Sequence, residues 1–183
     1  MQVDLSKYNN SWYSPGKGVL VCVLWYIMNE FFFKTGFPIS TSMKVFILRM
    51  YGAKIGKNLC IKPCVNIKYP WNLEIGDNTW IGENVWIDNL EKVKIGNNVC
   101  ISQGALLLCG NHNYKKVSFD LLVGKIVLED GVWIGAQSVV TGGVVVGSHA
   151  VLTVKSVASQ NLDSYSIYQG NPVKKIRERI IVD

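Results

Sequence analysis

Between Ile55 and Leu162 an aliphatic residue recurs every six residues within each turn, with two extra residues between the first turns, and this period constrains the fold more than any other feature of the sequence. Three blocks open with Ile-Gly, at Ile55, Ile75 and Ile95, so their starts are evenly spaced. After a polar interruption the period resumes at Leu128 and continues in slightly shorter turns, which open at Leu128 and Val146. The spacing predicts five turns, each made of three short strands.

A six-residue unit is too short to bury its own apolar side chain, so it must stack on copies of itself to form a core. Asparagine recurs where a turn needs a residue that can adopt a left-handed backbone conformation. These asparagines are Asn58, Asn78, Asn84 and Asn98. An ordinary sandwich of short strands would show irregular spacing of about 8 to 12 residues between turns. The pattern therefore predicts a mainly β protein built of stacked coils.

Residues 1–54 lie outside the repeat and carry most of the excess positive charge. The chain has 183 residues and a formal net charge of +6, and six basic against two acidic residues in 1–54 supply +4 of it. We expect a helical region over 1–54, a coiled domain over 55–163 with an excursion loop over 111–125, and a C-terminal turn and tail over 164–183. No signature of a helix-turn-helix, zinc-finger or aromatic RNA-binding module is present, so we expect no nucleic-acid partner.

The cysteines indicate a reducing compartment and give no support for a metal centre. There are five, and no two of them are separated by two residues, which does not fit a disulfide framework. Cys60 and Cys64 form one spaced pair, but a zinc site needs further ligands. We therefore expect a cytoplasmic protein without a bound metal.

Residues 19–33 form an apolar stretch in which only Asn29 and Glu30 are polar. As a helix the stretch would reach about 22 Å at 1.5 Å per residue, which is short of the roughly 30 Å hydrocarbon core of a bilayer. We therefore expect no membrane span. Two roles remain open: a helix that lies on the inner face of the membrane as a peripheral contact, and a helix that covers the open end of the coils.

A second helix is expected from Thr41 to Tyr51, with Ser40 or Thr41 as its N-terminal cap. Four apolar residues share one face of this helix, and we expect that face to cover the first coil. They are Met43, Phe46, Ile47 and Met50.

The single interruption of the period is a polar loop that contains His112. A polar loop that leaves a rigid scaffold is a common place for function. The only other histidine, His149, occupies a turn position inside the repeat and is expected at the surface. Acyl transfer from a thioester to an alcohol needs a base that takes the hydroxyl proton, and imidazole has its pKa near working pH. His112 is therefore the candidate catalytic base.

Repeat, loop and tail, over about residues 52–180, together resemble the hexapeptide-repeat acetyltransferases. The resemblance implies a left-handed parallel β-helix of about five coils, preceded by the helical region and followed by a short C-terminal helix. The handedness rests on the resemblance alone, because general crossover rules favour right-handed connections. The resemblance also implies acetyl coenzyme A as co-substrate, direct attack by an acceptor hydroxyl that His112 activates, and a homotrimer with sites between subunits.

Two later segments are similar to the family's donor site: Leu128–Ala136, and Tyr168–Lys174 with its Gly-Asn-Pro turn. The resemblance implies acetyl coenzyme A contacts at Trp133, Gly135, Ala136, Val154, Lys174 and Arg177. The family usually has Gly-Ala-Gly where this chain has residues 153–155, Thr-Val-Lys, and the added bulk could narrow the cleft.

Register arithmetic places Asp88 and Asn89 beneath the start of the loop, because the turn length that separates Ile75 from Ile95 also separates positions 88–92 from 108–112. Together with Tyr114 they are the candidate acceptor-binding residues. The Trp-Ile-Asp-Asn block at 86–89 and the Gly-Asn-His-Asn-Tyr loop look most like the colanic-acid-type exopolysaccharide O-acetyltransferases. That similarity implies a saccharide acceptor, either free or lipid-linked.

Two alternatives stay open from the sequence. An antibiotic O-acetyltransferase would share the donor site and the mechanism, and a non-catalytic β-helix would act only as a scaffold. A third class is not supported: the zinc-dependent β-helix carbonic anhydrases bind their metal through three histidines, and this chain has only two histidines.

Overall fold

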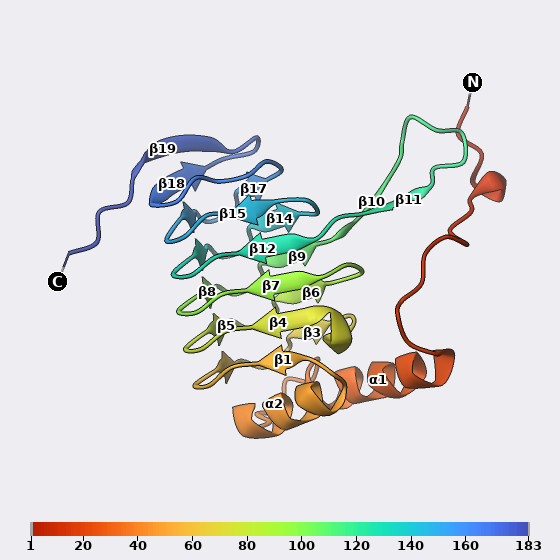
Figure 1. Ribbon diagram of the computed structural model, residues 1–183, viewed down its shortest axis with the longest axis horizontal. Coiled ribbons are helices and arrows are strands. Elements are labelled where there is room, and N and C mark those ends of the chain that lie inside the picture. The colour runs from red at the N-terminus through yellow and green to blue at the C-terminus, as the bar shows by residue number, and fades with distance from the viewer. Residues whose placement is uncertain (1, 183) are drawn as a thin grey trace.

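The computed structural model describes residues 2–182 as a stack of parallel β-coils, with two helices across one end and an antiparallel hairpin projecting from the side (Figure 1). Each complete coil contributes one short strand to each of three sheets. There are five complete turns and the start of a sixth, so the mainly β, coiled architecture is confirmed.

The strands and helices have the following bounds. The first sheet contains β1 (Lys54–Ile55), β4 (Leu73–Ile75), β7 (Val93–Ile95), β12 (Ile126–Leu128) and β15 (Val145–Val146). The second contains β2 (Cys60–Ile61), β5 (Trp80–Ile81), β8 (Cys100–Ile101), β13 (Trp133–Ile134), β16 (Val151–Leu152), β18 (Ser166–Gln169) and β19 (Lys174–Glu178). The third contains β3 (Asn66–Ile67), β6 (Trp86–Asp88), β9 (Leu106–Leu108), β14 (Val139–Thr141) and β17 (Val157–Ala158). The hairpin is β10 (Gly110–His112) and β11 (Leu121–Val123), the α-helices are α1 (Val19–Phe32) and α2 (Thr41–Met50), and short 3-10 turns cover Leu5–Lys7 and Pro70–Asn72.

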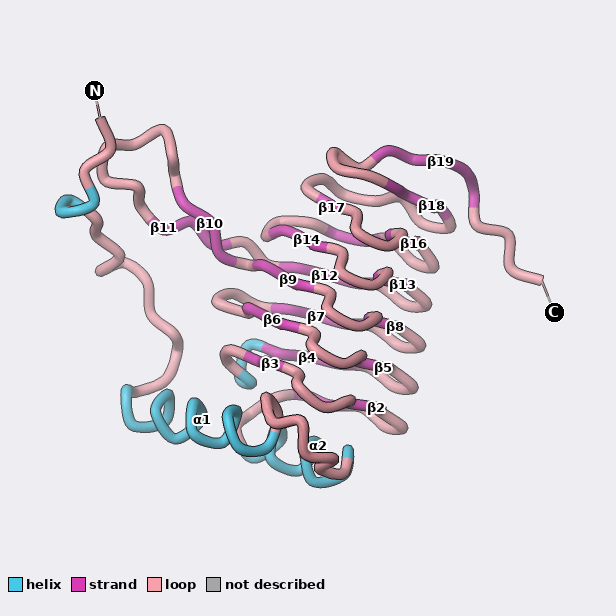
Figure 2. The backbone as a smooth tube through the Cα atoms, turned by 180° about the vertical axis from the view of Figure 1, so that it is seen from behind, coloured by secondary structure: helices cyan, strands magenta, loops and turns pink. Residues whose placement is uncertain are grey.

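The register follows the period of the sequence. Ile55, Ile75 and Ile95 pair in successive strands of the first sheet, so each Ile-Gly block stacks on the block before it. Trp133 pairs with Val151, which matches the shorter turns of the later repeats. The repeating aliphatic residues point inward and are buried, except that Ile55 in the first coil is partly buried. The four turn asparagines have φ between 54° and 57°. Figure 2 shows the second and third sheets from behind, with their strands one above the other.

Helices α1 and α2 cover the first coil, whose strands have no neighbouring coil on that side. The indole of Trp25 donates to the carbonyl of Ile67 at 2.9 Å, and the Asn29 side chain accepts from the backbone N–H of Ile67 at 3.3 Å. Lys44 is fully buried and donates to the carbonyl of Lys62 at 2.8 Å. An unpaired strand edge would otherwise carry buried backbone groups without partners, so these polar side chains complete the end of the stack.

The expected face of α2 was partly wrong. Ile47 packs on the first coil as expected, but its inward neighbours are Lys44 and Leu48. Met43, Phe46 and Met50 point away from the coil and are 46%, 60% and 64% exposed. The helix turns this way because Lys44 supplies hydrogen bonds that the first coil needs, which a methionine or phenylalanine cannot donate. No helix within residues 2–182 is long and apolar enough to cross a membrane.

The expected C-terminal helix was also wrong. Residues Lys174–Glu178 form β19, which pairs antiparallel with β18 on the last coil. The strand covers the edge of the final coil, just as the helices cover the edge of the first, and a helix would have left the backbone groups of β18 unpaired.

Candidate functional site

The hairpin holds His112 at the corner between the third and first sheets. Nδ1 of His112 lies 3.0 Å from the carbonyl oxygen of Phe119, and the two rings stack with centroids 4.5 Å apart and planes within 6°. A carbonyl oxygen can only accept, so Nδ1 carries the proton, and in the neutral imidazole the lone pair is on Nε2. The imidazole is therefore held in the tautomer that a general base requires.

The N-terminal arm, residues 2–17, runs beside the hairpin and contributes side chains that the sequence did not reveal (Figure 1). The backbone N–H of Asp4 donates to the carbonyl of Val117 at 2.8 Å, and the ring of Tyr8 lies 5.9 Å from that of His112. The Tyr13 hydroxyl donates to the carbonyl of Leu90, and burial raises the pKa of this phenol above its ordinary value. The arm has no periodic pattern, so nothing in its sequence predicted this position.

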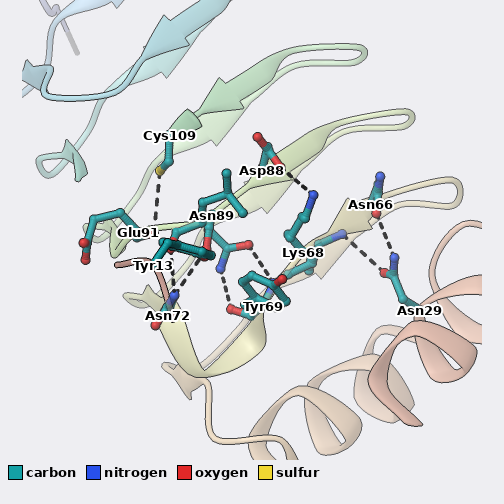
Figure 3. Close-up of polar contacts among 12 residues, drawn as sticks. Tyr13, Asn29, Asn66, Lys68, Tyr69, Asn72, Asp88, Asn89, Glu91 and Cys109 are labelled. Atoms are coloured by element: carbon teal, nitrogen blue, oxygen red, sulfur yellow. Dashed lines mark hydrogen bonds and ion pairs between the residues drawn. The ribbon is translucent and has the colours of Figure 1, made fainter. Parts of the chain in front are cut away.

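Asp88 lies directly beneath the hairpin, as the register arithmetic predicted. It pairs with Leu108 in the adjacent coil. Its side chain is buried, and one carboxylate oxygen lies 3.5 Å from the ammonium of Lys68 (Figure 3). The other oxygen faces the start of the hairpin, since a Cβ placed on Gly110 would lie 3.5 Å from it. A negative charge is thus held close to the strand that ends in His112.

Asn89 and Tyr114, the other two candidates for the acceptor, differ in their exposure. Asn89 is fully buried, and its amide accepts from the backbone N–H of Tyr69 and donates to the carbonyl of the same residue (Figure 3). Its polar atoms are therefore bound within the protein. Tyr114 lies in the hairpin loop and is 71% exposed. A cavity of about 510 Å³ opens between α1 and the third sheet, and Lys68, Tyr69 and Trp86 are among the residues that line it.

The candidate donor residues gather at a different corner, between the second and third sheets. Gly135 and Ala136 follow β13, and Val154 follows β16 one coil above. A Cβ on Gly135 would lie 2.6 Å from the backbone nitrogen of Val154, so only glycine permits this contact. Trp133 is 47% exposed on the second sheet, and its indole donates to the hydroxyl of Ser102 at 2.9 Å.

The hairpin of β18 and β19 lies above this donor corner. Lys174 pairs with Gln169 next to the turn, whereas Arg177 pairs with Ile167 further along the strand. Both basic side chains are exposed, and within residues 2–182 neither forms a salt bridge. The neighbouring Lys175 is different, because its ammonium lies 2.8 Å from a carboxylate oxygen of Glu178.

Within one chain, His112 and the candidate donor residues do not lie together. His112 follows the third sheet and precedes the first, while Gly135 and Val154 lie between the second sheet and the third. The base and the candidate donor corner therefore occupy different corners of the same stack. In the part of the chain described by the structure, no three His, Cys, Asp or Glu side chains are grouped as metal ligands would be.

Comparisons with known proteins identify relatives of the chain. No family model matches the chain. The chain is 32% identical to the acetyltransferase WcaF of Escherichia coli K12, named for colanic acid biosynthesis, over 97% of each protein. It is 27% identical to the galactoside O-acetyltransferase of the same organism, over 80% of this chain and 73% of that protein. The crystal structure of a hexapeptide-repeat acetyltransferase from Vibrio cholerae with acetyl coenzyme A superposes with a TM-score of 0.79 at 21% identity, covering 88% of each chain. The chain therefore belongs to the hexapeptide-repeat family of acetyl-coenzyme-A-dependent acetyltransferases.

Proposed function

We propose that the protein transfers an acetyl group from acetyl coenzyme A to a hydroxyl of a saccharide, with His112 as the general base. One observation carries the catalytic role: the Phe119 carbonyl binds Nδ1 of His112 and leaves Nε2 free to take a proton. The choice of acceptor is supported by the two relatives named for colanic acid biosynthesis and for galactoside O-acetylation.

In this mechanism Nε2 of His112 removes the proton from the acceptor hydroxyl as its oxygen attacks the thioester carbonyl. The tetrahedral intermediate then collapses, the carbon–sulfur bond breaks, and the thiol of coenzyme A receives the proton from the imidazolium. No acyl-enzyme is needed. Cys109, the thiol nearest the hairpin in sequence, is buried, and burial raises its pKa to about 12, so it is a poor nucleophile at neutral pH.

The acceptor is proposed to bind beside the hairpin, next to the coil edge that carries Asp88. The buried carboxylate can accept hydrogen bonds from sugar hydroxyls, and the exposed Tyr114 can cover the ligand from the loop. Asn89 acts as a positioning residue, because its amide links its coil to the backbone of Tyr69. A cytoplasmic location suits acetyl coenzyme A and the five cysteines, which are all free thiols.

The donor is proposed to bind at the second corner, against Trp133, Gly135, Ala136 and Val154, with Lys174 and Arg177 close to its phosphates. Thr153, Val154 and Lys155 are the departure from the family pattern, and of these Thr153 is half-buried whereas Val154 and Lys155 are exposed. Because the base and this corner are separate in one chain, we propose that a second subunit completes the site in a homotrimer. The second sheet has an apolar outer face with the exposed Trp80 and Trp133, as an interface between subunits would. The outer face of the first sheet is charged, because Lys54, Glu74 and Lys94 lie on it.

The test offers acetyl coenzyme A with a panel of saccharides, free and lipid-linked, and with chloramphenicol, and measures the released thiol. We expect release with a saccharide, and in His112→Ala we expect turnover to fall by about two orders of magnitude or more while acetyl coenzyme A still binds. Release with chloramphenicol alone would favour the antibiotic acetyltransferase. Failure of acetyl coenzyme A to bind would favour a scaffold.

A further inference from the structure

Helix α1 is apolar on the side that faces away from the protein as well as on the side that faces it. Its inward side packs Trp25 and Asn29 against the first coil. The outward side carries four large apolar side chains that are 45–71% exposed: Leu20, Leu24, Ile27 and Phe31. A helix that is apolar all round normally lies in a buried environment, so the outward side of α1 lacks a cover in the single chain.

Helix α2 and the connecting loop extend this apolar surface. Met43, Phe46 and Met50 are exposed on α2, and Phe37 in the loop is 69% exposed. Both helices cross the same end of the stack, so their outward sides face the same way (Figure 1). We call this set of exposed residues on α1, α2 and their loop the end surface. Contiguous apolar patches of this kind mark contacts with a membrane or with another protein.

Basic residues surround the end surface. Between residues 16 and 64 the chain has seven Lys or Arg and one Asp or Glu (7 − 1 = +6). Three of the seven do not contribute free surface charge, because Lys44 is buried and Lys34 and Lys54 form salt bridges with Glu30 and Glu74. Of the others, Lys17 and Lys57 are exposed, and neither forms a salt bridge among residues 2–182. Arg49 and Lys57 line a cavity of about 400 Å³ beside the exposed ring of Phe46. Cations here lie next to apolar side chains, as they do where a protein meets lipid headgroups.

We propose that the end surface docks on a bilayer that contains anionic lipid, with α1 and α2 lying in the plane of the interface. An apolar face with a basic rim matches acyl chains below and anionic headgroups around them. Neither helix is long enough to cross the bilayer, so the contact is peripheral. A second copy of the chain is a poorer occupant of the end surface, because two copies meeting end to end would bring their basic rims together.

The experiment is flotation of the full chain with vesicles of phosphatidylcholine, alone or with about 30% phosphatidylglycerol. We expect binding to the anionic vesicles, and we expect Phe31→Glu and Leu20→Glu each to weaken the partition coefficient at least about tenfold. Both side chains are 71% exposed, so the substitutions leave the packed side of α1 intact. The matched control is Ile180→Glu, at an 84% exposed residue near the C-terminus, which should bind like the unaltered protein.

A second pair of variants tests the charge. Lys17→Gln with Lys57→Gln should weaken binding to anionic vesicles and leave the small partition into neutral vesicles unchanged. The proposal is overturned if Phe31→Glu floats as well as the unaltered protein. It is also overturned if the unaltered protein does not bind vesicles and Phe31→Glu has a lower mass than the unaltered protein in light scattering. That result would assign the end surface to a second copy of the chain. Acetyl transfer is not needed for flotation, so failure here leaves the proposed enzymatic function standing.

Discussion

The indole nitrogen of Trp25 donates a hydrogen bond to the carbonyl oxygen of Ile67 at 2.9 Å, from a side chain that is 1% exposed. Ile67 ends β3, the last strand of the first coil, where no neighbouring coil is available to supply a donor. The helical region therefore does more than exclude water from the core. It replaces the missing coil with side-chain hydrogen bonds, at a position where a lost partner leaves a buried carbonyl unpaired.

Replacing Trp25 by Phe should test this cap, because phenylalanine keeps an apolar ring but cannot donate. The buried carbonyl of Ile67 would lose a partner, at a cost of about 1–3 kcal/mol in the free energy of unfolding. Urea unfolding followed by circular dichroism would measure it. The control is Trp12→Phe, at a residue that is 57% exposed and has no side-chain hydrogen bond in the described chain. Equal losses in the two variants would remove the special role of Trp25.

The stack of Phe119 on His112 predicts a second result. Phe119→Leu keeps the backbone carbonyl that binds Nδ1 but removes the ring that restricts the imidazole, so we expect kcat to fall by roughly threefold to tenfold, well short of His112→Ala. The KM for acetyl coenzyme A should stay unchanged. Phe31→Leu, at an exposed position on α1, is the control. A loss as large as that of His112→Ala would mean that the ring has another role.

Asp88→Asn should separate acceptor binding from donor binding. The substitution removes the charge that lies 3.5 Å from Lys68 and faces the hairpin, while the volume stays nearly the same. We expect the KM for the acceptor to rise by about tenfold or more, since hydrogen bonds to a charged group are worth about 1.5–3 kcal/mol. The KM for acetyl coenzyme A should not change. Steady-state kinetics with each substrate varied would show the split, with the exposed Glu83→Gln as the control.

Glu74 predicts a pH dependence of stability. Its carboxylate accepts from Lys92 at 2.8 Å and from Lys54 at 2.9 Å, and these hydrogen bonds lower the pKa of Glu74 from 4.5 to about 2. A lowered folded-state pKa stabilises the protein above the ordinary pKa, and that contribution is lost as the pH falls from 4.5 towards 2. The urea midpoint of Glu74→Gln should therefore lie below that of the unaltered protein at pH 6, and the gap should shrink in this acidic range.

Glu83→Gln is the control for this measurement, because Glu83 is exposed and has no salt bridge within residues 2–182. Its midpoint should follow that of the unaltered protein at every pH. A gap for Glu74→Gln that stays constant down to pH 2 would contradict the assigned lowering of the pKa.

The sequence predicts what repeats and does not predict what is irregular. Counting places Asp88 beneath Leu108, because a stacked coil repeats its register. The hydrogen bond of His112 to Phe119 depends on how an irregular loop folds back, and no period describes that. Lys44 is buried although its charge favours the surface, because it satisfies carbonyls at the end of the stack that no local pattern reveals. The basic composition of the tail fits a helix, but the open edge of β18 makes it a strand.

A complementation experiment tests whether a second subunit completes the site. His112→Ala removes the base at one corner, and Ala136→Trp should block the donor corner with a bulky ring. Each variant alone should be inactive. If the chains form the proposed homotrimer and assort at random, a site built from the loop of one chain and the corner of another recovers both intact parts, so co-expression should restore roughly a quarter of full activity.

The reason for the expected recovery is that the two corners are separated within one chain by the width of the third sheet. If a single chain carried the whole site, every chain in the mixture would bear one defect and no mixture could be active. Mixing the separately purified variants without dissociating them is the control, since preformed trimers would not exchange chains. Activity that stays at the level of the single variants after co-expression, with mixed trimers shown by mass spectrometry, would place the base and the donor corner in the same subunit and overturn the shared site.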